Sequence, residues 1–275
     1  MNRSLSLNVL LVACLAFFIT LVGLPFWWVL SGSVKVPQEI ISRVPTMFPQ
    51  SFTLQHYIKL FEASAYPVYL VNSVIVAVSS TVITLLLAIP ASYAFFRLEF
   101  PGRGMLYRII LLAYAFPSIV VLIPLFGLFA KIGLIDRLPA LIIVNVAFAL
   151  PFSIWMLRSF LAGVPKEIEE AAVMDGAGTM TILRRIMIPL IAPGIASVGI
   201  YAFVTAWTEY VFGSVLILSD AKRTLPVGFS GIIGQYQIDW GLLLAGATVA
   251  IVPVVAIFAL IGRGFVSGLT EGAVK

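Results

Sequence analysis

Six long runs of apolar residues, separated by shorter polar segments, set the pattern of this chain. The runs lie at roughly 8–30, 71–96, 107–129, 138–157, 191–217 and 242–261. A bilayer core of about 30 Å is crossed by about 20 mostly apolar residues in a helix, and every run reaches that length. The pattern predicts an all-α, polytopic membrane protein that forms a single domain over residues 1–275, with six transmembrane helices.

Positive charges in the connections indicate how the chain crosses the membrane. An even number of spans places both termini on one side. Lys and Arg are enriched in cytoplasmic loops, and the short connection between the second and third runs carries Arg97, Arg103 and Arg108. We therefore expect cytoplasmic N- and C-termini. We interpret the net charge of +5 as a sign of this orientation rather than of a nucleic-acid partner.

Composition excludes several other classes of protein. Only 11% of the residues are charged and 61% are hydrophobic, whereas about 25% are charged in an ordinary soluble domain. This excludes a soluble enzyme, a disordered chain and a nucleic-acid-binding module. With Cys14 and His56 as the single cysteine and the single histidine, the chain has no intramolecular disulfide and no set of Cys and His metal ligands. We interpret His56 as a surface residue.

The outer segment that follows the first run, 31–67, contains a predicted short amphipathic helix. Four of its apolar residues have the spacing of one helix face: Leu54, Tyr57, Ile58 and Phe61. Thr53 is a candidate N-cap, and His56 and Lys59 fall on the polar side. We expect this helix to lie at the outer membrane surface or to pack on the helix bundle.

The longest cytoplasmic connection, 158–190, has the features of a short helix, a sharp turn and a second helix. Pro165 suits the first turn of a helix, and acidic residues favour the positive end of the helix dipole. Three glutamates follow it: Glu167, Glu169 and Glu170. Asp175 and Gly176 indicate the stop, with Gly176 able to adopt positive φ, and Thr179 is a candidate cap for the second helix.

Two interpretations of this connection remain open from the residues alone. Ala171 and Ala172 would let another protein approach the backbone closely, and Glu170 could pair with an arginine of that protein. In the other interpretation the segment is a solvated charged link between two spans. Connections of this length usually carry function, which favours docking.

The spacing of this segment resembles the EAA loop of ABC importer permeases. That loop has E-A-A, three residues, glycine, nine residues and then I-x-L-P. The chain has the same order from Glu170 to Pro189, with Gly176 at the glycine and Ile188 in place of leucine.

Other segments are similar to the carbohydrate-uptake branch of these permeases. They are Asn72–Ser73, YAFFRLEFPG at 93–102, WTEY at 207–210 and GLTEGAVK at 268–275. At Thr208 the family usually has asparagine, so family contacts at that position do not transfer. The resemblance is to the smaller, six-span permease subunit of maltose-type importers.

The resemblance implies a place in an assembly of the bacterial cytoplasmic (inner) membrane. The implied partners are a second permease forming a heterodimer, two ATP-binding subunits, an extracytoplasmic solute-binding protein and the lipid bilayer. The implied ATPase-coupling residues are Glu170, Ala171, Ala172, Asp175, Gly176 and Ala177. The resemblance also implies that the tail 268–275 reaches the ATPase interface. The cargo would be a monosaccharide, an oligosaccharide or a polyol.

ATP hydrolysis is expected in the partner and not in this chain. The segment from Gly176 to Thr179 is glycine-rich, but it lacks the lysine of the G-x-x-x-x-G-K-[ST] phosphate loop and follows no predicted strand. We therefore predict that the chain is not an enzyme and holds no cofactor. ATP and Mg²⁺ would be bound by the ATP-binding subunits.

Glu209 is the one acidic residue well inside a predicted span. A carboxylate at the centre of a span costs about 2.5–3.5 kcal/mol on insertion scales, so it normally faces a cavity or a partner helix. Three interpretations are open: a polar lining of the sugar pathway together with Trp207 and Tyr210, a hydrogen bond between helices, or a misplaced span end.

The alternative function is a secondary transporter or channel that works without ATPase partners. Such proteins usually carry their coupling charges within the membrane, and Glu209 is the only candidate. Co-purification of an ATPase and a related permease would distinguish the two functions.

Overall fold

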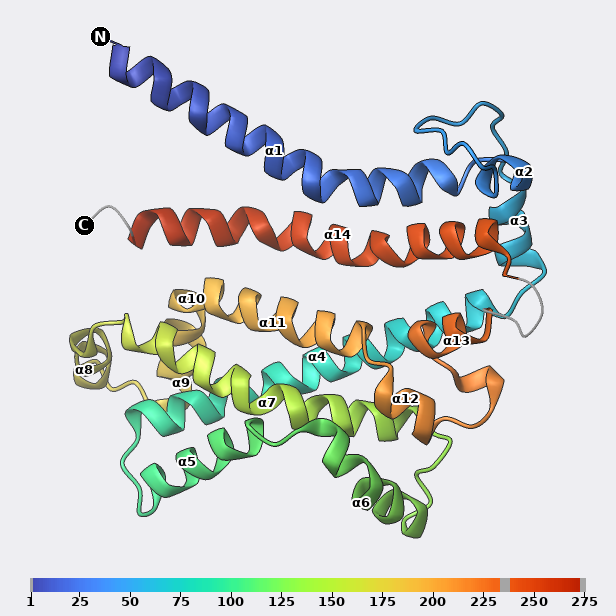
Figure 1. Cartoon of the computed structure of the whole chain (residues 1–275). Coiled ribbons are helices and arrows are strands. Elements are labelled where there is room, and N and C mark those ends of the chain that lie inside the picture. Colours follow the sequence, from blue (N-terminus) through green and yellow to red (C-terminus); the bar gives the residue numbers. More distant parts are fainter. Residues whose placement is uncertain (1, 233–237, 273–275) are drawn as a thin grey trace. The chain divides into compact units, whose positions relative to one another are not determined.

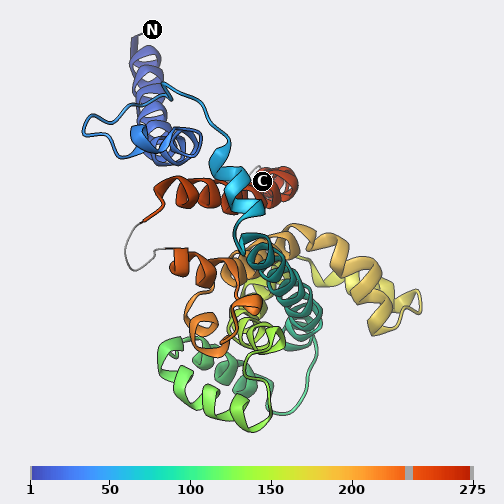
Figure 2. The same ribbon diagram turned by 90° about the vertical axis from the view of Figure 1, so that its right-hand side faces the viewer.

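The computed structural model describes residues 2–232 and 238–272, and within them every extended regular element is helical (Figures 1 and 2). Lys35 and Phe52 add an isolated antiparallel bridge. The helices are α1 (Asn2–Gly32), α2 (Pro37–Ile40), α3 (Gln55–Glu62), α4 (Tyr66–Arg97), α5 (Arg103–Tyr114), α6 (Ser118–Lys131), α7 (Leu138–Ala162), α8 (Lys166–Met174), α9 (Thr179–Ile182), η1 (Leu183–Met187), α10 (Ile188–Leu190), α11 (Ala192–Trp207), α12 (Val211–Leu216), η2 (Asp220–Lys222), α13 (Leu225–Ile232) and α14 (Trp240–Gly272).

Four of these helices are long and apolar enough to cross a membrane: α1, α4, α7 and α14. Two further pairs meet the same test only together, because each is sharply bent. The angle is 99° between α5 and α6, and 79° between 179–190 and α11. The described helices thus give four candidate spans, or up to six if each bent pair counts as one. The exact number of six remains a prediction.

Two of the predicted spans are not continuous helices. The prediction of one helix over 107–129 is wrong, because α5 ends at Tyr114 and α6 begins at Ser118. Pro117 lies in this break and disfavours helical backbone at the residue before it. The prediction over 191–217 is also wrong, because α11 ends at Trp207 and α12 begins at Val211.

The chain divides into two compact units, 1–67 with 229–253 and 68–228 with 254–275. In the first unit α1 exposes its apolar side chains along most of its length, as a helix that faces lipid would. In its polar segment, the Glu39 carboxylate accepts hydrogen bonds from the Thr46 hydroxyl and the Gln50 amide. The bond from Thr46 is the main reason why the pKa of Glu39 is lowered.

The predicted amphipathic helix is present as α3, and the side that it buries within the first unit is the one that carries His56. Leu54, Ile58 and Phe61 are exposed, whereas Leu60 and His56 are buried. The interpretation of His56 as a surface residue is therefore wrong. Its Nε2 donates to the Lys35 carbonyl oxygen at 2.8 Å.

The burial of His56 depends on a close approach by the start of α14 within the same unit. A Cβ on Gly241 would lie 2.2 Å from Nδ1 of the imidazole, so glycine is required there for the ring to fit. Asp239, two residues before Gly241, forms an ion pair with Lys59 at 2.5 Å. Burial raises the pKa of the Asp239 carboxyl, but the bond from Lys59 and the Leu242 amide outweigh it and lower the pKa overall.

In the second unit α7 is the central helix, and α11 packs along it (Figure 1). One cluster of buried side chains joins α4, α7, α8 and the η1 region to the start of α11. Its members include Tyr93, Leu157, Leu161, Ala172, Leu183, Met187 and Ile191. A second cluster joins α4, α6, α7 and α12, with Val76, Phe129, Leu141, Val144, Phe212 and Leu216. The long helices α4 and α7 contribute to both clusters and therefore link the two ends of this unit.

Candidate functional site

The predicted helix–turn at 165–176 is present as α8, which lies at one end of the second unit beside α9 (Figures 1 and 2). Pro165 has extended backbone and precedes the helix, and Glu167 and Glu169 occupy its first turn. Gly176 has φ of +82°, the left-handed conformation that glycine adopts at low cost. The local chemistry of the segment therefore predicted both the helix and its end.

The end of α8 has the hydrogen bonds of a Schellman motif. The Gly176 amide donates to the Val173 carbonyl oxygen at 2.9 Å, and the Ala177 amide donates to the Ala172 carbonyl oxygen at 2.9 Å. The next helix begins at Thr179 with Gly178 in the capping position, one residue earlier than predicted. These two hydrogen bonds fix the direction in which the chain leaves α8.

The six predicted coupling residues lie on α8 and the turn that follows it, and they divide into exposed and buried residues. Glu170, Ala171, Asp175 and Gly176 are exposed, and 62% of the Glu170 side chain is accessible to solvent. Ala172 packs into the core of the unit, and the half-buried Ala177 packs against the same core. The exposed part of the motif is available to another protein, while the rest holds the helix to the bundle.

The main polar attachment of α8 involves residues that the sequence analysis did not select. The Glu169 carboxylate lies 2.5 Å from Nε of Arg97 and accepts a hydrogen bond from the Tyr93 hydroxyl at 3.0 Å. Only 12% of the Arg97 side chain and 11% of the Glu169 side chain are exposed. The available signal was the three-residue spacing of Glu169 and Ala172, which places both on one face of the helix.

Glu209 lies in the break between α11 and α12 and not inside a helix. Its two carboxylate oxygens accept hydrogen bonds from the Phe212 amide at 2.7 Å and the Gly213 amide at 3.0 Å. The side chain thus satisfies two of the unpaired donors at the start of α12. The carboxylate therefore caps α12, and the three interpretations of its role stay predictions.

A cavity of about 440 Å³ lies beside this break within the second unit. Glu209 and Tyr210 line it, whereas Trp207 is buried and stacks on Phe203 with ring centroids 5.5 Å apart. The lining combines aromatic rings with hydroxyl and amide groups: Tyr114, Phe116, Phe148 and Tyr201 with Ser118, Asn145, Thr205 and Thr208. Tyr114 and Tyr201 were not among the predicted pathway residues, because the breaks between helices beside this cavity were not predicted.

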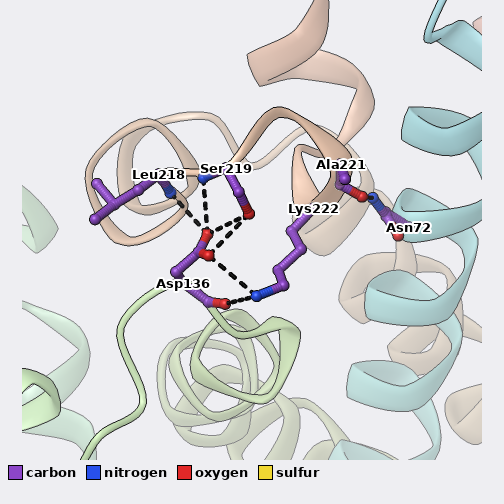
Figure 3. Close-up of polar contacts among 6 residues, drawn as sticks. All are labelled: Asn72, Asp136, Leu218, Ser219, Ala221 and Lys222. Carbon is purple, nitrogen blue, oxygen red and sulfur yellow. Dashed lines mark hydrogen bonds and ion pairs between the residues drawn. The ribbon is translucent and has the colours of Figure 1, made fainter.

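The other end of the second unit is fixed by the loop that follows α12. Asp136, at positive φ between α6 and α7, accepts hydrogen bonds from the amides of Leu218 and Ser219 and from the Ser219 hydroxyl, and pairs with Lys222 at 3.0 Å (Figure 3). The bonds from Ser219 are the main reason why the pKa of the Asp136 carboxyl lies well below its usual range.

Polar residues of α4 hold the same loop from a second side. The Asn72 amide donates to the Ala221 carbonyl oxygen at 3.1 Å (Figure 3). It also donates to the Arg223 carbonyl oxygen at 2.9 Å. Ser73 accepts a hydrogen bond from the Leu225 amide at 2.7 Å. Asn72 and Ser73, which resemble a family segment, thus also hold this loop in place.

Residues 268–272 of the predicted tail form the last part of α14. Residues 273–275 lie outside the described residues, and the side chains of 268–272 are not described. The place of the tail in an ATPase interface stays a prediction.

The known proteins that are similar to this chain are described as membrane components or permeases of transport systems. Residues 80–270 match the family described as "Binding-protein-dependent transport system inner membrane component". The inner membrane ABC transporter permease protein YcjP of Escherichia coli (strain K12) is 39% identical over 263 residues, which cover 95% of this chain and 94% of YcjP. The trehalose transport system permease protein SugB of Mycobacterium tuberculosis (strain CDC 1551 / Oshkosh) is 35% identical over 254 residues, 92% of each chain.

The fold is also similar to that of a solved membrane transporter. A chain in the crystal structure of a bacterial ABC transporter involved in the import of the acidic polysaccharide alginate superimposes with a TM-score of 0.84. The match covers 96% of this chain and 98% of the other at 20% identity. Together with the family match over residues 80–270, this places the chain among the inner membrane components of binding-protein-dependent transport systems.

Proposed function

We propose that this chain is a permease subunit of an ABC importer that carries a sugar across the bacterial inner membrane. One observation carries the proposal: α8 presents exposed Glu170 and Ala171, and the turn after it has Gly176 at φ of +82°, with the spacing of the EAA loop. The relatives support the cargo class, since SugB is named for trehalose and the permease SmoH of Agrobacterium fabrum for sulfoquinovosyl glycerol.

The proposed assembly contains a second permease, two ATP-binding subunits that hold ATP and Mg²⁺, and a solute-binding protein on the outer side. In this arrangement both termini and α8 are cytoplasmic. The exposed side of α8 contacts an ATP-binding subunit, and closure of the two ATP-binding subunits moves α8 and the bundle attached to it. Such rigid-body movement of packed elements is a common form of conformational switching.

The proposed sugar pathway includes the 440 Å³ cavity. Aromatic faces pack on the apolar faces of sugar rings, and nearby polar groups fix their orientation. Tyr210, Tyr201 and Thr205 offer both kinds of contact in this cavity. Glu209 lines it while capping α12, and Trp207 supports it from the packed side.

The alternative of a secondary transporter or channel has less support. The family consists of components of binding-protein-dependent systems, and the capping role of Glu209 already accounts for its carboxylate. That leaves the alternative without its only candidate for an intramembrane coupling charge.

The proposal is tested by purifying the tagged chain in mild detergent with the proteins that accompany it. We expect an ATP-binding protein and a second permease in the complex. After reconstitution into liposomes with the solute-binding protein, we expect ATP-dependent uptake of a monosaccharide, oligosaccharide or polyol. A purified chain that transports without any ATP-binding partner would contradict the proposal.

Two neighbouring glycines provide a matched pair of variants that test the role of α8, the proposed coupling helix. An added Cβ meets no atom within 4 Å at either Gly176 or Gly178, but Gly176 has φ of +82° and Gly178 has φ of −75°. Alanine at Gly176 therefore strains the turn by about 1–2 kcal/mol, whereas alanine at Gly178 does not. We expect Gly176→Ala to reduce ATP-dependent uptake strongly and Gly178→Ala to leave it near the wild-type rate. Equal uptake by the two variants would remove this turn from coupling.

A further inference from the structure

Arg97, the last residue of α4, forms a junction between three helices. Its Nε pairs with Glu169 of α8 at 2.5 Å. One of its terminal nitrogens donates to the Val164 carbonyl oxygen at 2.6 Å and lies 3.4 Å from the Leu161 carbonyl oxygen, both where α7 ends. The guanidinium thus binds the side chain of one helix and backbone carbonyl groups where another helix ends.

Stability alone gives no reason for an ion pair at this place. Removal of two charges from water carries a desolvation cost for each ion, and well-packed apolar residues in place of a buried pair are often as stable or more stable. Arg97 and Glu169 are nevertheless nearly buried, and the buried Tyr93 adds a hydroxyl that donates to the other carboxylate oxygen. Directional contacts of this kind fix an orientation that apolar packing leaves less defined.

The junction lies directly behind the face that α8 offers to a partner. Glu169 is inside and Glu170, the next residue, is exposed. Any displacement of α8 by a partner therefore acts on Glu169, and through it on the end of α4. The guanidinium also lies 4.7 Å from the ring centroid of Phe96, a cation–π contact that further restricts its movement.

We propose that Tyr93, Arg97 and Glu169 are positioning residues that transmit the movement of α8 to α4, so that ATP hydrolysis drives transport. The inference rests on the proposed function and deepens it, because it names the path by which the coupling helix acts on the bundle. All three are buried or nearly buried, and they determine how α8 is held relative to α4 and α7.

The test uses the complete reconstituted complex and three variants, Glu169→Gln, Arg97→Gln and Tyr93→Phe. Glu167→Gln is the matched control, because it makes the same change at an exposed residue of the same helix. Three quantities are measured: the amount of ATP-binding subunit retained, the ATPase rate with and without loaded solute-binding protein, and the sugar transported per ATP hydrolysed.

We expect Glu169→Gln and Arg97→Gln to retain the ATP-binding subunit and to lower the sugar transported per ATP by about tenfold. Tyr93→Phe removes one hydrogen bond and should lower the ratio by about twofold to threefold. Glu167→Gln should leave the ratio at the wild-type value. These results would distinguish a positioning role from a role in folding. Residues that serve folding only would change the amount of complex but not the sugar transported per ATP.

Wild-type ratios in both Glu169→Gln and Arg97→Gln would overturn the inference. The inference would also be overturned if these two variants lost the ATP-binding subunit while Tyr93→Phe kept the wild-type amount of sugar transported per ATP. The three residues would then serve folding only. Failure of the proposed function is a separate result: the wild-type chain would retain no ATP-binding subunit, and Gly176→Ala would have no effect on transport.

Discussion

The two ends of α4 are both tied to a neighbouring segment by a tyrosine and a carboxylate, but in different surroundings. At the C-terminal end Tyr93 donates to Glu169 of α8, and the ion pair beside it is nearly buried. At the N-terminal end Tyr69 donates to Asp220 at 2.8 Å in the loop after α12. The charges there are half exposed, and many separate hydrogen bonds share the attachment.

The difference indicates how each end responds to a change. A buried pair is screened little by salt, and loss of one partner leaves a charge without compensation. In an exposed network, each hydrogen bond can be lost without the others, and each loss lowers the stability only modestly. We therefore expect the attachment of α8 to fail when one charge is lost. We expect the attachment of the loop to weaken only in part when one hydrogen bond is lost.

The largest effect is expected when one charge of the buried pair is removed. Glu169→Leu leaves the Arg97 guanidinium buried without a counter-charge and should lower the free energy of unfolding by about 3–5 kcal/mol. The double variant Arg97→Met/Glu169→Leu should recover much of this loss. Thermal unfolding of the purified complex in detergent measures both, and a double variant less stable than Glu169→Leu would contradict the account of a paired charge.

An intermediate effect is expected at the loop end from Asn72→Ala. The change removes the donor that reaches the carbonyl oxygens of Ala221 and Arg223 and should cost about 1–3 kcal/mol. Val71→Ala, at the exposed neighbouring position of α4, is the control for loss of side-chain volume. If the two variants unfold at the same temperature, the amide of Asn72 does not hold the loop.

The smallest effect is expected at Asp136, and it depends on pH. Its carboxyl has a pKa below the unfolded value of about 3.9. Its contribution to stability is therefore complete above that value and is lost as the pH falls through the lower, folded pKa. Asp136→Asn should unfold at a lower temperature than wild type near neutral pH, and the gap should narrow below about pH 4. A gap that stays constant down to about pH 2 would show that the Asp136 charge contributes nothing.

The sequence predicted those features that depend on neighbouring residues. The acidic start of α8, its two alanines and the turn at Gly176 are set by local capping chemistry, and they appear in the structure as expected. Features that depend on distant residues escaped the prediction. Arg97 and Glu169 are far apart in the chain, and the burial of His56 depends on the close approach of Gly241.

Prolines illustrate the same limit. Pro90, Pro151 and Pro253 lie inside continuous helices, whereas Pro117 lies at the bend between α5 and α6. Proline thus lies within a continuous helix at some positions and at a break at another. The packing around a span decides whether the helix continues past the missing amide of proline. The break that places Glu209 at the start of α12 could not be read from composition for the same reason.

Cross-linking from the exposed face of α8 tests the central claim most directly. Native Cys14 is replaced by serine and a single cysteine is introduced as Ala171→Cys, with Gln50→Cys, an exposed position in the predicted outer segment, as the control. With a bifunctional thiol reagent we expect Ala171→Cys to be joined to the ATP-binding subunit and Gln50→Cys not to be. An Ala171→Cys residue that reacts with the reagent but never joins that subunit would contradict the account.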